Sequence, residues 1–132
     1  MQIKKSIVEQ EVDSSFAYTL LRNDLLPELL GQEEETILYW AGKHLAKKYP
    51  LSSIEEICDF FQKARWGTLS VVKEKPNTIV FELAPPDPSP RHFKLEAGFL
   101  AEQFALMKER VTEAFEQVKR KRVIFTVESN EQ

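Results

Sequence analysis

Thr68-Leu-Ser-Val-Val-Lys-Glu-Lys-Pro-Asn-Thr-Ile-Val-Phe-Glu-Leu83 is the stretch of sequence that decides the fold. Apolar and polar residues alternate on both sides of its centre, in Leu69-Ser-Val71 and again in Phe81-Glu-Leu83. Because the side chains of a strand point alternately to its two faces, a period of two predicts two strands, each with one buried face. The intervening Lys75-Pro-Asn77 has the composition of a turn. The stretch therefore predicts a β-hairpin.

Three helical patterns precede the hairpin. The first begins after a capping serine, Ser14 or Ser15, and is expected to end at Pro27, which lacks the N–H of a helix interior. A short turn ending on Gly31 follows. The second pattern has carboxylates in its first turn and lysines in its last, as the helix dipole favours. The third opens with two overlapping capping boxes. The predicted helices cover residues 14–26, 33–49 and 53–64.

The chain after the hairpin changes character several times. Four prolines within residues 85–90 predict a stiff exposed loop, because proline fixes φ and has no N–H. Phe93 and Leu95 alternate with polar residues and predict a short strand. A helix is expected from Gly98 to about Met107. Residues 111–118 fit both a helical stripe and a strand, whereas the β-branched and aromatic residues of 123–127 predict a strand.

Bulk properties indicate an ordinary globular protein. The 132 residues fit one domain, with a net charge of −3 and 42% hydrophobic residues. We expect a loose arm over residues 1–13, a single α+β domain over 14–128 and a tail over 129–132. The single cysteine, Cys58, favours a reducing, cytoplasmic location. Neither a signal peptide nor a membrane-spanning segment is expected.

Several stretches resemble the YslB-like family, a bacterial family of unknown function. The resemblance covers roughly residues 14–128, and its clearest segments lie at residues 37–46, 66–67, 95–103 and 123–127. The order of elements is more distantly similar to 4-vinyl-reductase-type domains and to the small subunits of the TRAPP tethering complex. Those relatives imply a twisted antiparallel sheet of about four strands packed against a layer of helices.

The same resemblance implies two further features. It assigns residues 110–118 and 121–128 to strands around a basic turn. It also implies an apolar groove or channel and dimerisation through helices. The cysteines that bind metal in many 4-vinyl-reductase-type domains have no counterparts in the last hairpin, and Cys58 does not match the acylated cysteine of some TRAPP subunits.

Four residues are candidates for an apolar pocket or interface: Trp40, Gly42, Trp66 and Phe99. Aromatic rings line many ligand sites, although core or interface packing is the commoner role of a tryptophan. Gly42 and Ala46 are small residues four apart on one helix, so another backbone is expected to approach them closely. Trp66-Gly67 is expected to open the first strand.

The polar candidates are weaker. Glu96 and Glu102 form a carboxylate pair that acid–base chemistry would need, but neither has an evident partner. His44 and His92 are expected to be solvated and to bind no metal, because no further ligand lies at a metal-site spacing. Cys58 is expected to be a small, unreactive hydrophobe. The basic run 119–122 is interpreted as a solvent-facing turn, so nucleic-acid binding is disfavoured.

These observations favour a non-enzymatic binding or interaction module that forms a homodimer. The motivation is the lack of catalytic and cofactor motifs, together with more apolar helix residues than one thin sheet needs; they are Phe16, Leu20, Leu25, Leu29, Leu30, Trp40 and Phe61. The alternatives are a carrier or sensor of a small hydrophobic ligand, and an enzyme of unknown class acting through Glu96 or Glu102. No catalytic residue, cofactor or metal is predicted.

Overall fold

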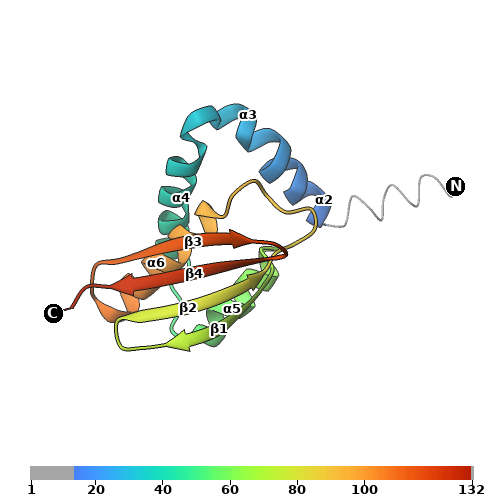
Figure 1. Ribbon diagram of the computed structural model, residues 1–132. Helices are drawn as coiled ribbons and strands as arrows, with labels where there is room; N and C mark the ends of the chain where they lie inside the picture. The colour runs from blue at the N-terminus through green and yellow to red at the C-terminus, as the bar shows by residue number, and fades with distance from the viewer. Residues whose placement is uncertain (1–13, 132) are drawn as a thin grey trace, which may run out of the picture.

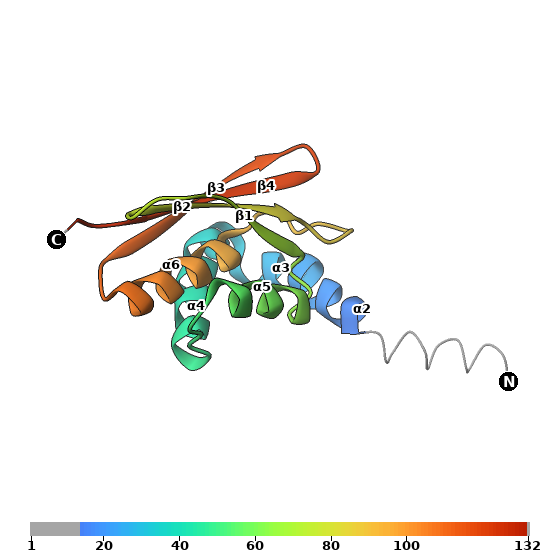
Figure 2. The same cartoon turned by 90° about the horizontal axis from the view of Figure 1, so that it is seen from below.

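The computed structural model describes residues 14–131, so the predicted arm over residues 1–13 lies outside the described residues. The chain forms two layers, a four-stranded antiparallel sheet and a layer of helices on one of its faces (Figure 1; Figure 2). The strands are β1 (Thr68–Glu74), β2 (Thr78–Ala84), β3 (Thr112–Lys119) and β4 (Arg122–Ser129). Their spatial order is β1-β2-β4-β3. The predicted α+β fold and both hairpins are confirmed.

The sheet buries the face that its alternating pattern predicts. Phe81 of β2 lies opposite Phe125 of β4, and both side chains are completely buried. Residues two positions along each strand continue this inner face, among them Ile79, Leu83 and Val123. No helix among residues 14–131 covers the outer face (Figure 2).

Helix α6 (Lys94–Lys108) lies between the sheet and helix α4 (Glu34–Lys48) (Figure 1). The predicted strand at Phe93–Leu95 is wrong, and the helix begins four residues before Gly98. Two glycines let α4 and α6 pack with their backbones almost in contact. A Cβ atom on Gly42 would lie 2.1 Å from the Leu95 carbonyl oxygen, and one on Gly98 would lie 2.0 Å from the Tyr39 carbonyl oxygen.

An almost continuous helical arm leads into α4. It consists of α2 (Ser14–Thr19), a π-helix η1 (Leu20–Leu25), α3 (Leu26–Leu30) and the 3₁₀ turn η2 (Gly31–Glu33). The predicted break at Pro27 is wrong. Pro27 lies in the first turn of α3, where its missing N–H costs little. The chain instead changes direction at Gly31, whose φ of 56° suits glycine.

Helix α5 (Ile54–Lys63) is capped by Ser53, which fits the predicted pairing of Ser53 with Glu56. The Glu56 N–H donates to Ser53 Oγ at 3.1 Å, while Glu56 Oε1 accepts from the Ser52 N–H at 2.8 Å. After α5 the chain reaches Gly67, whose φ of 123° and close approach to the Ala84 carbonyl require a glycine. This junction between α5 and β1 forms one wall of the site described next.

Candidate functional site

A pocket of about 700 Å³ opens where three parts of the chain meet. One wall comes from α2 and η1, with Phe16, Tyr18 and Asn23. The second comes from the α5–β1 junction, with Gln62, Arg65 and Thr68. The third is the loop over residues 85–93, here called the proline strap, which contributes Pro86, Asp87, Pro88 and Pro90. The pocket therefore combines aromatic and proline rings with amide, hydroxyl and charged groups.

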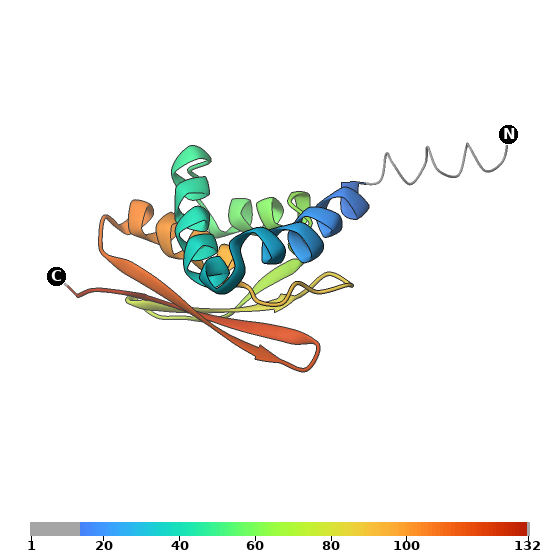
Figure 3. The same cartoon turned by 90° about the horizontal axis from the view of Figure 1, so that it is seen from above.

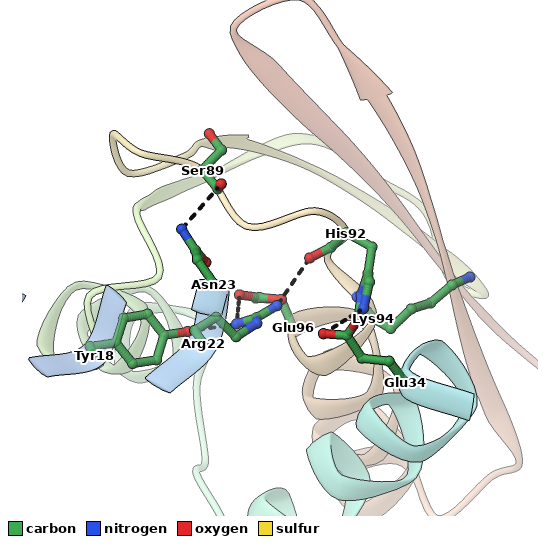
Figure 4. Close-up of polar contacts among 8 residues, drawn as sticks. All are labelled: Tyr18, Arg22, Asn23, Glu34, Ser89, His92, Lys94 and Glu96. Carbon is green, nitrogen blue, oxygen red and sulfur yellow. Dashed lines mark hydrogen bonds and ion pairs between the residues drawn. The ribbon is translucent and has the colours of Figure 1, made fainter. Parts of the chain in front are cut away.

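A buried ion pair lies beside this pocket (Figure 4). Arg22 of η1 and Glu96 of α6 form two parallel hydrogen bonds, Nη1 to Oε2 at 2.9 Å and Nη2 to Oε1 at 3.0 Å. Arg22 Nη2 also donates to the His92 carbonyl oxygen at 3.0 Å, and Nη1 donates to Tyr18 Oη. The arrangement joins the arm, the proline strap and α6 at one point.

The ion pair affects the protonation of Arg22 and of its neighbour Tyr18. Burial acts to lower the pKa of the Arg22 guanidinium, but the Glu96 carboxylate outweighs it and raises that pKa, so Arg22 stays charged. Burial raises the pKa of the Tyr18 phenol, although Arg22 and hydrogen bonds from Arg22 and Trp66 act in the opposite direction. Tyr18 is therefore a neutral phenol at physiological pH that lines the pocket and accepts hydrogen bonds from the core.

His92 belongs to a second buried contact that fastens the strap. Its Nδ1 accepts from the Lys94 N–H at 3.3 Å, and its Nε2 lies 3.5 Å from Glu34 Oε2 at the start of α4. Both side chains are buried, so the expectation of a solvated His92 is wrong. Asn23 Nδ2 adds a longer contact of 3.4 Å to the Ser89 carbonyl oxygen. The strap is thus held from both α4 and η1 (Figure 4).

The four apolar candidates do not surround a common cavity. Trp66 and Phe99 lie in an aromatic cluster with Phe60 and Phe61, with ring centroids 4.5–6.1 Å apart. Gly42 contacts the backbone of α6. Trp40 is exposed and stacks on the equally exposed His44, with ring centroids 5.5 Å apart. Phe61 is completely buried and so contributes nothing to an exposed apolar surplus.

The two carboxylate candidates are also separated. The charge of Glu96 is balanced by the Arg22 guanidinium, whereas Glu102 lines a different, shallower hollow with Lys43 and Arg110. Six residues of α-helix place them about 9 Å apart along α6 and on different faces. Cys58 is half-buried; burial and the carboxylates of Asp59 and Glu55 raise its pKa, which opposes nucleophilic chemistry.

Sequence reasoning missed Arg22, whose position carried a signal. Four residues recur every four positions and share the inward face of the arm: Tyr18, Arg22, Leu26 and Leu30, with Arg22 as the one charged member.

Sequence reasoning also missed a polar contact at the sheet edge. Tyr39 Oη accepts from the Ala114 N–H at 3.1 Å and bonds Glu113 Oε1, which also accepts from Lys43 Nζ at 3.1 Å.

Within residues 14–131, no three His, Cys, Asp or Glu side chains are grouped so as to hold a metal ion. No helix in the described part of the chain has both the length and the apolar composition to cross a bilayer.

Solved structures support the fold. The chain is similar to a vinyl-4-reductase family protein from Methanocaldococcus jannaschii, with a TM-score of 0.60 and 20% identity over 71% of this chain and 68% of that one. It is also similar to an H-NOX protein from K. algicida in its Fe(II) unliganded form, with a TM-score of 0.52 and 14% identity over 74% and 64% of the two chains. At these identities the likeness concerns architecture alone.

Sequence relatives are closer. The uncharacterized protein YslB of Bacillus subtilis (strain 168) is 45% identical over 93% of this chain and 94% of its own length. The uncharacterized protein MJ1642 of Methanocaldococcus jannaschii is 29% identical over 70% of this chain and 60% of its own length. The family model described as "Protein of unknown function (DUF2507)" matches residues 15–128, and the chain therefore belongs to that family.

Proposed function

We propose that this protein is a non-enzymatic binding module that holds a small amphipathic molecule in the pocket beneath the proline strap. The observation that carries the proposal is the pocket itself, since about 700 Å³ lies within the range of small-molecule sites. Its walls suit such a ligand. The rings of Phe16, Tyr18 and the strap prolines offer apolar contact, and Asn23 and Gln62 offer directed hydrogen bonds.

Tyr18 gives the pocket a specific polar group. Its oxygen accepts from Arg22, its raised pKa keeps its proton on, and the O–H is the group that can donate to a ligand. A ligand acceptor placed there would be coupled through Arg22 to Glu96 and to the strap. Glu96 is held in an ion pair with Arg22, and Glu102 lies on a different face of α6, so the two carboxylates do not act together. Their arrangement favours binding over acid–base catalysis.

Blocking the pocket tests this function. Thr68→Trp places a large ring at the pocket wall, while Ser70→Trp places the same ring two residues along the same face of β1, outside the pocket. Medium-chain fatty acids and aromatic carboxylic acids serve as probes, and thermal unfolding measures the stability that each adds. Native mass spectrometry detects any molecule that co-purifies with the protein. A ligand at roughly a hundred times its Kd adds about 2.7 kcal/mol of stability. We expect this gain in the parent protein and in Ser70→Trp but not in Thr68→Trp.

A second candidate function, self-association as a homodimer, has its own supporting observation. Five large apolar side chains of the arm are exposed: Phe16, Leu20, Leu21, Leu25 and Leu29 have 62%, 50%, 47%, 46% and 67% of their surface accessible. Contiguous apolar surface of this kind favours a protein partner. Light scattering at micromolar concentration tests it. We expect twice the 15.3 kDa chain mass, and a monomer at every concentration would contradict it.

A further inference from the structure

Four of the five exposed apolar residues of the arm, Phe16, Leu20, Leu25 and Leu29, form one row because of the π-helix, and Leu21 follows Leu20 directly in sequence. Their spacings are four, five and four residues, and the five-residue step from Leu20 to Leu25 coincides with η1. A π-helix bonds five residues back, as the Leu26 N–H does to the Leu21 carbonyl oxygen, so this step returns to the same side of the helix. We name Phe16, Leu20, Leu25 and Leu29 the arm row. Tyr18, Leu26 and Leu30 of the arm are instead partly buried and pack on the core.

Along the arm and the first turn of α4 the exposed charges are acidic, while the exposed Arg65 of the α5–β1 junction lines the same pocket as Phe16. Asp24, Glu28, Glu33 and Glu35 are all exposed on the arm and the first turn of α4. Arg22 is the sole basic residue between Ser14 and Glu35, and it is buried against Glu96. The arm therefore presents an apolar row with an excess of negative charge, and a partner must supply apolar surface with positive charge around it.

The same chain carries a surface of that kind at the turn between β3 and β4. Lys119, Arg120, Lys121 and Arg122 are all exposed there, beside Val118, which is 60% exposed. The aliphatic stems of lysine and arginine add apolar surface while their charged ends reach outward. The turn projects from the sheet on the side away from the helices (Figure 2; Figure 3). We name residues 118–122 the basic turn.

The arm and the basic turn lie in opposite layers, so one chain cannot bring them together (Figure 3). We propose that they pair between two copies, with the basic turn of each copy seated on the arm row of the other. This inference rests on the proposed homodimer and specifies its interface. Under a two-fold axis this contact forms twice, once between the arm row of each copy and the basic turn of the other. Pairing arm to arm would instead bring the two acidic surfaces together.

Charge reversal gives a test with an internal rescue. One variant carries Asp24→Lys with Glu28→Lys, and the other carries Lys119→Glu with Lys121→Glu. Each variant alone places like charges in both contacts, so we expect its dimer dissociation constant to rise at least tenfold by light scattering and analytical ultracentrifugation. In a one-to-one mixture both contacts regain opposite charges, and we expect a mixed dimer with near-parental affinity. Dissociation of the parent dimer should also increase with salt.

The controls separate this inference from the dimer itself. Circular dichroism and thermal unfolding test whether each variant folds. If the variant with Asp24→Lys and Glu28→Lys does not fold, the milder variant with Asp24→Asn and Glu28→Gln replaces it. A parent protein that is monomeric throughout overturns both the dimer and its interface. A parental dimer whose affinity neither variant changes, or a mixture that does not restore affinity, overturns the pairing alone. Loss in each variant with recovery in the mixture supports it.

Discussion

Arg22 and Glu96 pair through two parallel hydrogen bonds across 74 residues of sequence, with only 2% and 1% of their side chains exposed. The pair connects the π-helix of the arm to the first turn of α6. Its third partner, the His92 carbonyl, brings in the end of the proline strap. The wall and the strap of the candidate pocket are therefore both positioned by one buried contact.

Removing one member of this pair should destabilise the protein strongly. Arg22→Met leaves the Glu96 carboxylate buried without a counter-charge, and we expect a loss of about 3–5 kcal/mol in the free energy of unfolding. Urea denaturation measures it. The double variant Arg22→Met with Glu96→Leu replaces the pair by apolar groups and should regain most of that loss. A loss below about 1 kcal/mol in the single variant would show that water reaches the carboxylate.

The glycine contacts between α4 and α6 predict a second effect. Gly98→Ala would place a methyl group 2.0 Å from the Tyr39 carbonyl oxygen, a backbone atom that cannot rotate away. Overpacking costs about 1–3 kcal/mol and more where the backbone must move, so we expect a loss at or above the top of that range. Gly31→Ala is a comparison, since its site is open and its cost comes only from the backbone conformation, with φ 56° and ψ −134°. A loss below about 1 kcal/mol for Gly98→Ala would contradict the close packing.

The sheet was predictable from the sequence, whereas helix α6 was predicted only in part. Each strand buries one face, so the alternation in Ile79-Val-Phe81 reports its structure directly. Helix α6 is buried on nearly all sides from Leu95 to Ala101, so it has no polar face to reveal a helical period. Two apolar residues, Phe93 and Leu95, then imitated a short strand. Strand β4 was predicted from its β-branched and aromatic residues, whereas β3 was assigned only through the family resemblance.

The candidate pocket could not be predicted from local pattern. It is formed by segments that the fold brings together from residues 15–23, 62–68 and 86–90. The aromatic candidates Trp66 and Phe99 instead fill the core, because large apolar rings gain most from complete burial. Arg22 was the detectable exception, a charged residue in an otherwise inward-facing row.

Tyr39 and Glu113 predict a pH effect at the β3 edge. Burial acts to raise the pKa of Glu113, but hydrogen bonds from Tyr39 and Lys43 outweigh it and hold that pKa below its ordinary value. A carboxyl with a lowered folded-state pKa stabilises the protein above its unfolded pKa of about 4.3. This contribution is lost as the pH falls through the folded pKa. We expect Glu113→Gln to reduce stability at neutral pH and to differ little from the parent at low pH, by urea denaturation.

Tyr39→Phe distinguishes this contact from a general charge effect. It removes the hydrogen bonds to Glu113 and from the Ala114 N–H but leaves the net charge unchanged, because burial raises the pKa of Tyr39 and keeps the phenol neutral. We expect the free energy of unfolding to fall by about 1 kcal/mol at neutral pH. We also expect the pKa of Glu113, measured by NMR titration, to move closer to its ordinary value. An unchanged Glu113 titration would contradict the contact.

Cys58 should be a slow nucleophile in the folded protein. Burial, and then the carboxylates of Asp59 and Glu55, raise the pKa of its thiol and so lower the thiolate fraction near pH 8. We expect iodoacetamide to alkylate Cys58 more slowly than free cysteine, with the rate approaching that of free cysteine in urea. Asp59→Asn with Glu55→Gln removes the charges but not the burial, so its rate should fall between these limits. A native rate equal to that of free cysteine would contradict the raised pKa, because neither burial nor charge would then be restraining the thiolate.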